Sequence, residues 1–270
     1  MSICAENSLL RLLTVGAVLA SLAGCASSAG SGRNNDTARV GSSVERVSPV
    51  RAAEANTRLG VGYLEQGKLQ IALEKLELAV HQDPKHAPAH LALGIIYQSI
   101  GRNDTALYHM KTAVALAPED GSAHNNYAVL LCRVGRFPEA DREFLKALED
   151  PFYQTPEVVL ANAGSCARRW GESERAERYL REALTYDPAF GEALFSMSEL
   201  SFDQGRLLPA RGFLQRLESQ GELTPEALLL AVRIERALGN EATAQQYASR
   251  LRSRHPGSAQ AEALKRDNLN

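Results

Sequence analysis

The sequence has few of the residues on which enzyme sites, metal sites and disulfide-rich folds depend. Its 270 residues include four cysteines, one tryptophan and six histidines. They contain no phosphate-binding glycine loop, no His-Glu-x-x-His zinc motif and no Gly-x-Ser-x-Gly nucleophile elbow. The formal net charge is −2, and no basic stripe suggests nucleic acid as a partner. These absences favour a non-enzymatic protein, and we predict no catalytic residue, metal ligand or bound cofactor.

Long apolar runs are also missing. The run from Leu12 to Ala20 is too short to span a bilayer, but it has the length of the apolar region of a signal peptide. It ends in Leu22-Ala23-Gly24-Cys25, which resembles the lipobox of bacterial lipoproteins. We therefore predict a lipoprotein signal peptide over residues 1–24 and a diacylglyceryl group on the Cys25 thiol. The alternative is an ordinary secretory signal.

The residues that follow Cys25 predict where the protein is held. Ala26, rather than Asp, comes next, which implies export to the outer membrane where sorting is enterobacteria-like. Acyl chains contribute about 0.8 kcal/mol per buried CH₂, so two or three of them form a lasting anchor. Residues 25–52 are rich in Ser, Gly, Asn and Arg and are predicted to be the lipidated cysteine and a flexible linker. We expect a lipid-anchored protein of the outer membrane that faces the periplasm.

The sequence does have a repeat. Six glycines recur at intervals of 34 or 36 residues, and an alanine follows each by five residues: Gly67, Gly101, Gly135, Gly171, Gly205 and Gly239, with Ala72, Ala106, Ala140, Ala176, Ala210 and Ala244. A 34-residue period with a turn glycine between two apolar-periodic halves is typical of tetratricopeptide (TPR) repeats. This predicts an all-α, right-handed α-solenoid of six helix-turn-helix repeats, at residues 53–86, 87–120, 121–156, 157–190, 191–224 and 225–256, followed by a tail at 257–270. Such solenoids present concave binding surfaces, so the predicted activity is protein binding.

The first helix of each repeat is expected to face the concave groove with its positions two, five, nine, twelve and thirteen, counted from the start of the repeat. The residues predicted to line a partner-binding groove are Thr57, Val61, Leu64, Leu91, Ile95, Gln98, Asn125, Val129, Arg133 and Arg168. The middle of this groove is apolar in the first repeats, which suits an amphipathic or extended peptide. For each apolar position, packing between repeats is the alternative.

Other side chains have two interpretations each. Arg168 and Arg169 are candidates to bind a partner's carboxylate, or they belong to a solvated helix face. Phe195 and Phe202 form either a second docking patch or part of the core. Trp170, which precedes a turn glycine, is predicted to be a packing residue.

Two cysteines remain in the repeats, Cys132 and Cys166, in the first helices of repeats three and four. Neighbouring first helices stack side by side and the periplasm is oxidising, so we predict a disulfide between them, with two separately buried thiols as the alternative. His86 and His90 have the i, i+4 spacing of a metal pair. They have no evident third ligand, and we predict a surface pair without metal.

Two stretches resemble a particular family. One contains His124-Asn125-Asn126-Tyr127, Leu131-Cys132 and Gly135-Arg136-Phe137; the other contains the connector Pro151 to Pro156, Ala161-Asn162-Ala163-Gly164 and Cys166. Both resemble the type IV pilus biogenesis/stability lipoproteins of the PilW/PilF kind, six-repeat TPR proteins that act as pilotins for the outer-membrane secretin. The resemblance covers roughly residues 53–256 and the signal. The 36-residue interval agrees, because the two extra residues lie in the connector.

The resemblance implies a non-enzymatic escort. Such a protein binds secretin subunits, travels outward with the lipoprotein-sorting machinery, and promotes multimer assembly in the outer membrane for pilus extrusion and twitching motility. We expect it to be monomeric. The alternative is a periplasmic TPR lipoprotein that serves as a scaffold for cell-wall (peptidoglycan) enzymes. An enzyme that captures substrate with its repeats is a third class, for which the sequence offers no catalytic constellation.

Overall fold

The computed structural model describes residues 48–266, which form helices joined by short turns. The predicted signal peptide, Cys25 and most of the predicted linker lie outside the described residues, as do residues 267–270. The helices are α1 (Pro49–Glu65), α2 (Leu69–Gln82), α3 (Ala87–Ser99), α4 (Asn103–Leu116), α5 (Gly121–Arg133), α6 (Phe137–Glu149), α7 (Pro156–Trp170), α8 (Ser173–Tyr186), α9 (Gly191–Asp203), α10 (Leu207–Glu218), α11 (Pro225–Ala237), α12 (Glu241–Arg254) and α13 (Ala259–Arg266).

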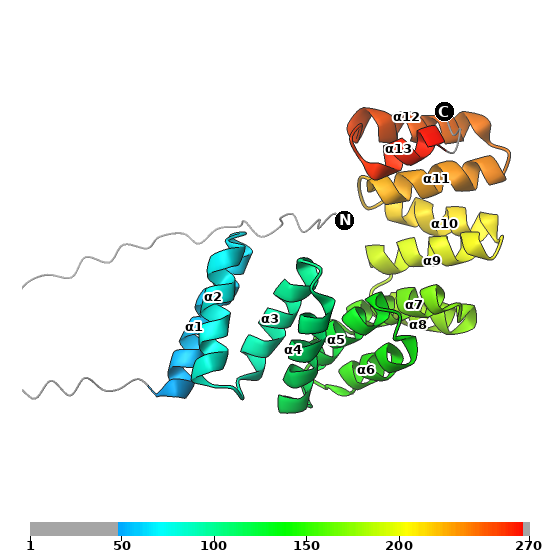
Figure 1. Cartoon of the computed structure of the whole chain (residues 1–270). Helices are drawn as coiled ribbons and strands as arrows, with labels where there is room; N and C mark the ends of the chain where they lie inside the picture. The colour runs from blue at the N-terminus through cyan, green and yellow to red at the C-terminus, as the bar shows by residue number, and fades with distance from the viewer. Residues whose placement is uncertain (1–47, 267–270) are drawn as a thin grey trace, which may run out of the picture. The chain divides into compact units, whose positions relative to one another are not determined.

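The first twelve helices form six hairpins, one for each predicted repeat (Figure 1). The odd-numbered helices α1 to α11 contact one another in succession, and we call them the inner helices. The even-numbered helices α2 to α12 are the outer helices, and in the described residues no outer helix contacts the next outer helix. The chain is therefore an α-solenoid with a continuous inner face, as predicted, and with clefts between its outer helices.

The repeated glycine and alanine have distinct physical roles. Each of the six repeat glycines ends the turn between the two helices of its hairpin with a positive φ, for example 90° at Gly171. Residues with a side chain rarely adopt this backbone conformation, which glycine reaches without steric cost. The six repeat alanines are completely buried, since the outer helix packs closely against its inner helix at that point. Both roles agree with the sequence prediction.

A second contact explains the small residue at position eight of most repeats. A Cβ atom added at Gly164 would lie 2.5 Å from Leu180 Cγ, and one added at Gly94 would lie 2.5 Å from Met110 Cγ. Both neighbouring side chains are fully buried, so they have little space to move. Glycine at this position allows the two helices of a hairpin to approach each other.

We expect Gly164→Ala to lower the free energy of unfolding by about 2 kcal/mol, because the new methyl group overpacks the contact with Leu180. Urea denaturation followed by circular dichroism measures this change. Gly62→Ala is the matched control, because a Cβ at Gly62 meets no atom within 4 Å. That substitution should be neutral or stabilise by up to about 1 kcal/mol. Equal effects of the two substitutions would contradict the packing role.

Both ends of the repeat array extend further than predicted. Helix α1 begins at Pro49, inside the stretch predicted to be linker, and the Ser48 hydroxyl accepts a hydrogen bond from Arg51 N at 3.3 Å. Ser-Pro is a favourable start for a helix, and this signal was missed. At the other end, the predicted tail contains α13, which packs Ala261 and Leu264 against α11 and α12. None of the described helices combines the length and the apolar character needed to cross a bilayer.

Candidate partner-binding groove

An apolar row follows position nine along the first three inner helices. Val61 on α1 is 37% exposed and Ile95 on α3 is 36% exposed, so both of these large apolar side chains reach solvent. Val129 continues the row on α5 and is partly buried. The other predicted groove residues that are partly buried on these helices are Leu64, Leu91 and Gln98. Because this row is apolar and open, it can accept the apolar face of a peptide.

The row becomes polar at the fourth repeat. Position nine is Ser165 on α7 and Glu199 on α9. The Arg168 guanidinium lies against this part of the inner face and donates to Glu199 Oε2 at 2.8 Å and to Asp203 Oδ2 at 2.7 Å. Burial raises the pKa of the Glu199 carboxyl, although the Arg168 charge opposes the shift. Arg168 is therefore held by two carboxylates of the same chain rather than presented to a partner.

The neighbouring Arg169 is exposed and lies over the Phe137 ring at 6.0 Å, while Arg133 is exposed at the end of α5. Trp170 stacks on Phe137 with ring centroids 6.3 Å apart, so it is a packing residue as expected. The end of α7 is thus fixed against the start of α6, and of these arginines only Arg133 and Arg169 offer their charge to solvent beside the groove.

Two predicted groove residues are buried and do not form its surface. Thr57 donates its hydroxyl hydrogen to Ala53 O at 2.8 Å within α1. Asn125 accepts from Asn162 Nδ2 at 3.2 Å and donates to the Tyr153 hydroxyl at 3.4 Å. Asn125 faces the next inner helix, whereas the Thr57 hydroxyl is bound within its own helix. Thr57 and Asn125 support the groove from within.

The Asn125 contacts bring together the two sequence stretches that carry the family resemblance. Tyr153 belongs to the connector between α6 and α7, Asn162 lies on α7, and Asn125 lies on α5. The longer connector allows Tyr153 to reach the inner helix of the previous repeat. The adjacent Phe152 is 87% exposed, more than any other large apolar side chain in the described residues. The connector therefore adds an exposed aromatic side chain that the groove prediction omitted.

A disulfide joins the same two inner helices. Cys132 on α5 and Cys166 on α7 are bonded, with their Cα atoms 5.8 Å apart, and both side chains are buried in the core. This arrangement is the first of the two predicted for these cysteines. It ties repeat three to repeat four close to the point where the apolar row ends.

Phe195 and Phe202 pack on the core of the C-terminal repeats. Both are partly buried and pack against the core around α11, including Leu228 and Leu229. The packing interpretation therefore fits these side chains.

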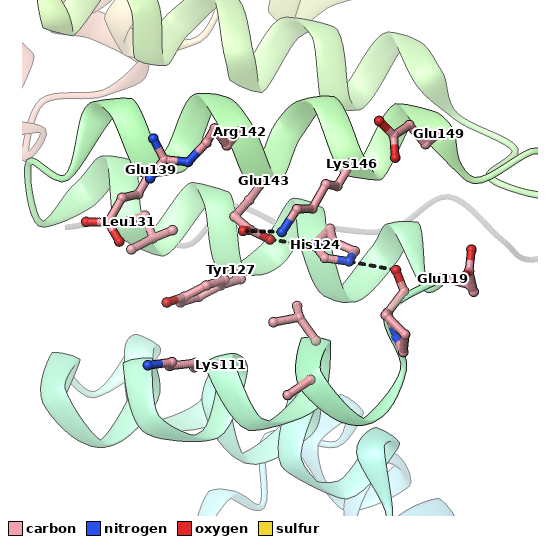
Figure 2. A pocket seen from close by; sticks show the side chains of 13 residues that line it. Lys111, Glu119, His124, Tyr127, Leu131, Glu139, Arg142, Glu143, Lys146 and Glu149 are labelled. Carbon is pink, nitrogen blue, oxygen red and sulfur yellow. Dashed lines mark hydrogen bonds and ion pairs between the residues drawn. The ribbon is translucent and has the colours of Figure 1, made fainter.

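The outer side of the solenoid has a cleft of about 540 Å³ between α4 and α6, with α5 as its floor. Figure 2 shows Lys111 on α4 and the side chains of α6 on either side of Tyr127 and His124. Its charged lining is mixed in sign: Lys111, Arg142 and Lys146 with Glu119, Glu139, Glu143 and Glu149. This mixture selects no ligand by charge.

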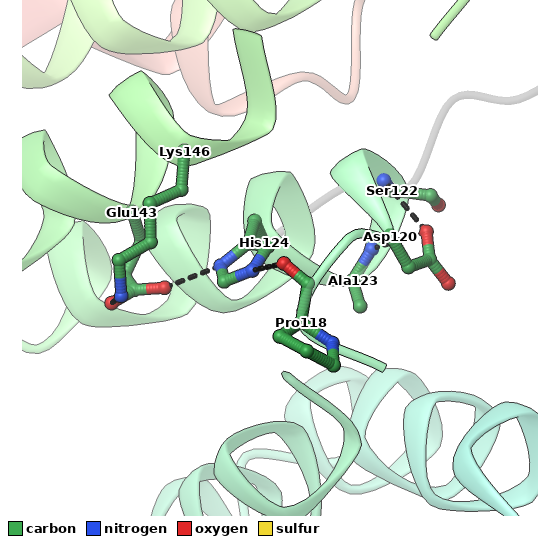
Figure 3. Close-up of polar contacts among 7 residues, drawn as sticks. All are labelled: Pro118, Asp120, Ser122, Ala123, His124, Glu143 and Lys146. Carbon is green, nitrogen blue, oxygen red and sulfur yellow. Dashed lines mark hydrogen bonds and ion pairs between the residues drawn. The ribbon is translucent and has the colours of Figure 1, made fainter. Parts of the chain in front are cut away.

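His124 on α5 contacts both α6 and the turn that precedes α5 (Figure 3). Its Nδ1 lies 2.6 Å from Glu143 Oε2, and its Nε2 lies 3.0 Å from Pro118 O. Lys146 Nζ donates to the other Glu143 oxygen at 2.9 Å. Both neighbours of the imidazole are hydrogen-bond acceptors. Each contact therefore needs a hydrogen, either on both ring nitrogens or on one ring nitrogen and the Glu143 carboxyl. No contact was predicted for this histidine.

His90 occupies the same position in repeat two, 34 residues earlier, and is buried. Its Nε2 lies 3.1 Å from Pro84 O, and its Nδ1 lies 3.1 Å from Nδ1 of His109. The prediction of a surface His86–His90 pair was therefore wrong, because His90 faces inward and pairs with His109. The recurrence of histidine at a 34-residue spacing was the signal that was missed. No group of three or more potential metal ligands occurs in residues 48–266.

The His90–His109 pair should make stability depend on pH. Burial, together with the neighbouring His90, lowers the pKa of His109 from 6.5 to about 4, and burial also lowers the pKa of His90. The unfolded chain then binds more protons than the folded chain between about pH 6.5 and pH 4. We therefore expect the free energy of unfolding to fall by about 1–2 kcal/mol over this range as pH decreases. The fall is smaller than the pKa shift alone would give, because the rings are only partly shielded from water.

His109→Glu tests this expectation, because it copies the His124–Glu143 contact of repeat three. The variant should lose most of the fall in stability, as measured by urea denaturation at several pH values. His81→Gln, on an exposed part of α2, should retain the wild-type dependence. The same pH dependence in wild type and His109→Glu would exclude the pair as its source.

Comparisons with known proteins agree with this geometry. Tetratricopeptide repeat models match residues 57–120, 91–154, 163–227 and 226–258. The chain belongs to the tetratricopeptide repeat family.

Within this family, the chain is a homologue of type IV pilus biogenesis proteins. It is 25% identical to the type IV pilus assembly protein PilF of Pseudomonas aeruginosa over 207 residues, which cover 77% of this chain and 82% of PilF. The crystal structure of PilW, a widely conserved type IV pilus biogenesis factor, matches with a TM-score of 0.74 and 31% identity over 78% of this chain and 97% of PilW. A structure of P. aeruginosa PilF matches with a TM-score of 0.69 and 26% identity, covering 81% of this chain and 99% of that one.

Proposed function

We propose that this protein is an outer-membrane lipoprotein that binds secretin subunits and promotes their localisation and multimerisation for type IV pilus biogenesis. The observation that carries the proposal is the relationship to PilF and PilW, which extends over about three quarters of the chain. Cys25, at the end of a lipobox-like sequence, supports lipid anchoring. The protein acts by binding rather than by catalysis.

The apolar row of Val61, Ile95 and Val129 is the binding surface that we assign to the secretin subunit. An amphipathic or extended segment laid across α1, α3 and α5 would cover these side chains and remove them from water. Arg133 and Arg169, which flank the row, would favour acidic residues in that segment. Binding affinity then comes from the groove, and location comes from the acyl chains.

The experiment that tests this function follows the host's pilus secretin in a strain that lacks the gene. Outer-membrane multimers should be lost, and the wild-type gene should restore them. Complementation with Cys25→Ala should leave secretin subunits bound but outside the outer membrane. Normal multimers in the deletion strain would exclude the proposal and turn attention to the alternative, a scaffold for cell-wall enzymes.

A further inference from the structure

Repeat five lacks a contact that repeats one and two share. At positions eleven and sixteen those repeats place a basic side chain over an aromatic ring: Lys68 lies 5.6 Å from the Tyr63 ring centroid, and Arg102 lies 5.5 Å from that of Tyr97. The corresponding residues of repeat five are Ser201 and Arg206. Serine leaves the arginine without an aromatic partner, and it leaves space where a ring lies in the other two repeats.

A cleft of about 340 Å³ occupies this place, between the outer helices α8 and α10. We call it the arginine cleft, and its lining is Arg181, Ser201, Arg206, Pro209, Gly212, Phe213 and Arg216. Among the described residues, the lining thus contains three guanidinium groups and no carboxylate. This composition contrasts with the mixed charges of the larger cleft between α4 and α6.

Glu177 lies beside the arginine cleft and neutralises part of the positive charge of its arginines. It accepts hydrogen bonds from Arg181 at 2.6 and 2.9 Å and from Arg206 Nη2 at 2.9 Å. The hydrogen bond from Arg181 lowers the pKa of the Glu177 carboxyl, so this side chain is ionised at neutral pH. One carboxylate against three guanidinium groups leaves an excess of positive charge around the cleft.

Two polar atoms of the cleft residues lack the partners that buried polar atoms normally have. The Ser201 hydroxyl is completely buried and has no hydrogen-bond partner, and neither does the buried Arg206 Nε. Arg216 donates from Nη2 to Pro188 O at 2.7 Å and lies over the Phe213 ring at 5.8 Å. Ser201 Oγ and Arg206 Nε thus lie beside the positively charged cleft with their hydrogen-bonding capacity unused, and both are covered by neighbouring atoms.

We propose that the arginine cleft binds a phosphate group. A tetrahedral anion accepts hydrogen bonds in several directions, which suits separate donors on Arg181, Arg206 and Arg216, with Ser201 at the floor. A carboxylate prefers two parallel donors of one guanidinium, and Glu177 already takes the Nη2 donor of Arg206. The phosphate group belongs to a soluble phosphate compound or to an anionic phospholipid headgroup. The site is separate from the inner groove, so it does not depend on the proposed secretin binding.

The test is a calorimetric titration of the full chain with inorganic phosphate at constant ionic strength. We expect saturable binding that Arg206→Gln weakens at least tenfold. Arg102→Gln is the matched control: it removes the same side chain at the same repeat position, where an aromatic ring already covers it, and it should bind phosphate like wild type. Ser201→Tyr, which restores the ring of repeats one and two, should also weaken binding at least tenfold without lowering the melting temperature.

A second measurement identifies the source of the phosphate group. Full chain carrying Cys25→Ala, and therefore without acyl chains, is sedimented with vesicles of phosphatidylglycerol or of phosphatidylcholine. Phosphatidylglycerol binding that requires Arg206 assigns a lipid headgroup, whereas phosphate binding without vesicle binding assigns a soluble compound. No saturable phosphate binding, or an equal loss in Arg102→Gln and Arg206→Gln, would overturn the proposal.

Discussion

The variant Ile95→Glu is expected to bind the secretin subunit at least about 100-fold more weakly than wild type. Ile95 lies in the middle of the apolar row and is open to solvent, with Val61 and Val129 on the inner helices to either side. A bound segment would bury the new carboxylate among apolar side chains without a partner. Loss of a central anchor costs about 2 kcal/mol or more, and burial of an unpaired charge adds to this cost, which together correspond to about a hundredfold in Kd.

Titration of labelled secretin subunit with purified protein measures this effect. Leu208→Glu is the control. Leu208 is, like Ile95, an exposed branched apolar side chain, but it lies on the outer helix α10. It should bind with wild-type affinity, and both variants should melt at the wild-type temperature. Unchanged affinity in Ile95→Glu, or an equal loss in Leu208→Glu, would remove the apolar row as the binding surface.

The repeat architecture could be predicted from the sequence because each repeat imposes the same local requirements. A positive φ at Gly171 and close packing at Ala176 depend on one hairpin alone, so they appear as fixed residue types at fixed spacing. The apolar character of the row at Val61 and Ile95 could be predicted for the same reason. The position of a residue within its own helix decides whether it lies on the inner face of the repeat.

The failures concern contacts between repeats, or between a repeat and its connector. Asn125 is buried because Tyr153 from the connector and Asn162 from the next repeat cover it, and Arg168 is paired because α9 supplies two carboxylates. Neither contact follows from the position of a residue within its own helix. The prediction for His90 was wrong because it considered only the helical spacing to His86, whereas the partner of His90 is on the following outer helix.

Some of the missed features did leave a signal across the repeats. Histidine recurs at position four as His90 and His124, and each points back to the carbonyl of a proline in the preceding turn, six residues earlier. The arginine cleft is marked by the change from Tyr97 to Ser201 at position eleven while an arginine is kept at position sixteen. In a solenoid, departures from the repeat are therefore as informative as the repeat itself.

The double variant Cys132→Ser, Cys166→Ser is expected to lose about 3–4 kcal/mol of unfolding free energy. The disulfide closes a segment of 34 residues, and the chain-entropy model gives this stabilisation for such a loop. Urea denaturation of the oxidised wild type and the double variant measures the difference. Both cysteines are replaced together, so that no reactive thiol remains to form other disulfides.

Reductant provides the matched control: it should lower the stability of the wild type to that of the double variant and leave the double variant unchanged. A difference of less than about 0.5 kcal/mol would mean that packing between α5 and α7 alone holds the two repeats together. The effect should be concentrated at this junction, because repeats in a solenoid are stabilised chiefly by their nearest neighbours. Hydrogen exchange should therefore increase most in α5 and α7, where Asn125, Asn162 and the connector also join repeats three and four. Since the apolar row ends at this junction, loss of the disulfide would loosen the groove at its α5 side while leaving Val61 and Ile95 in place.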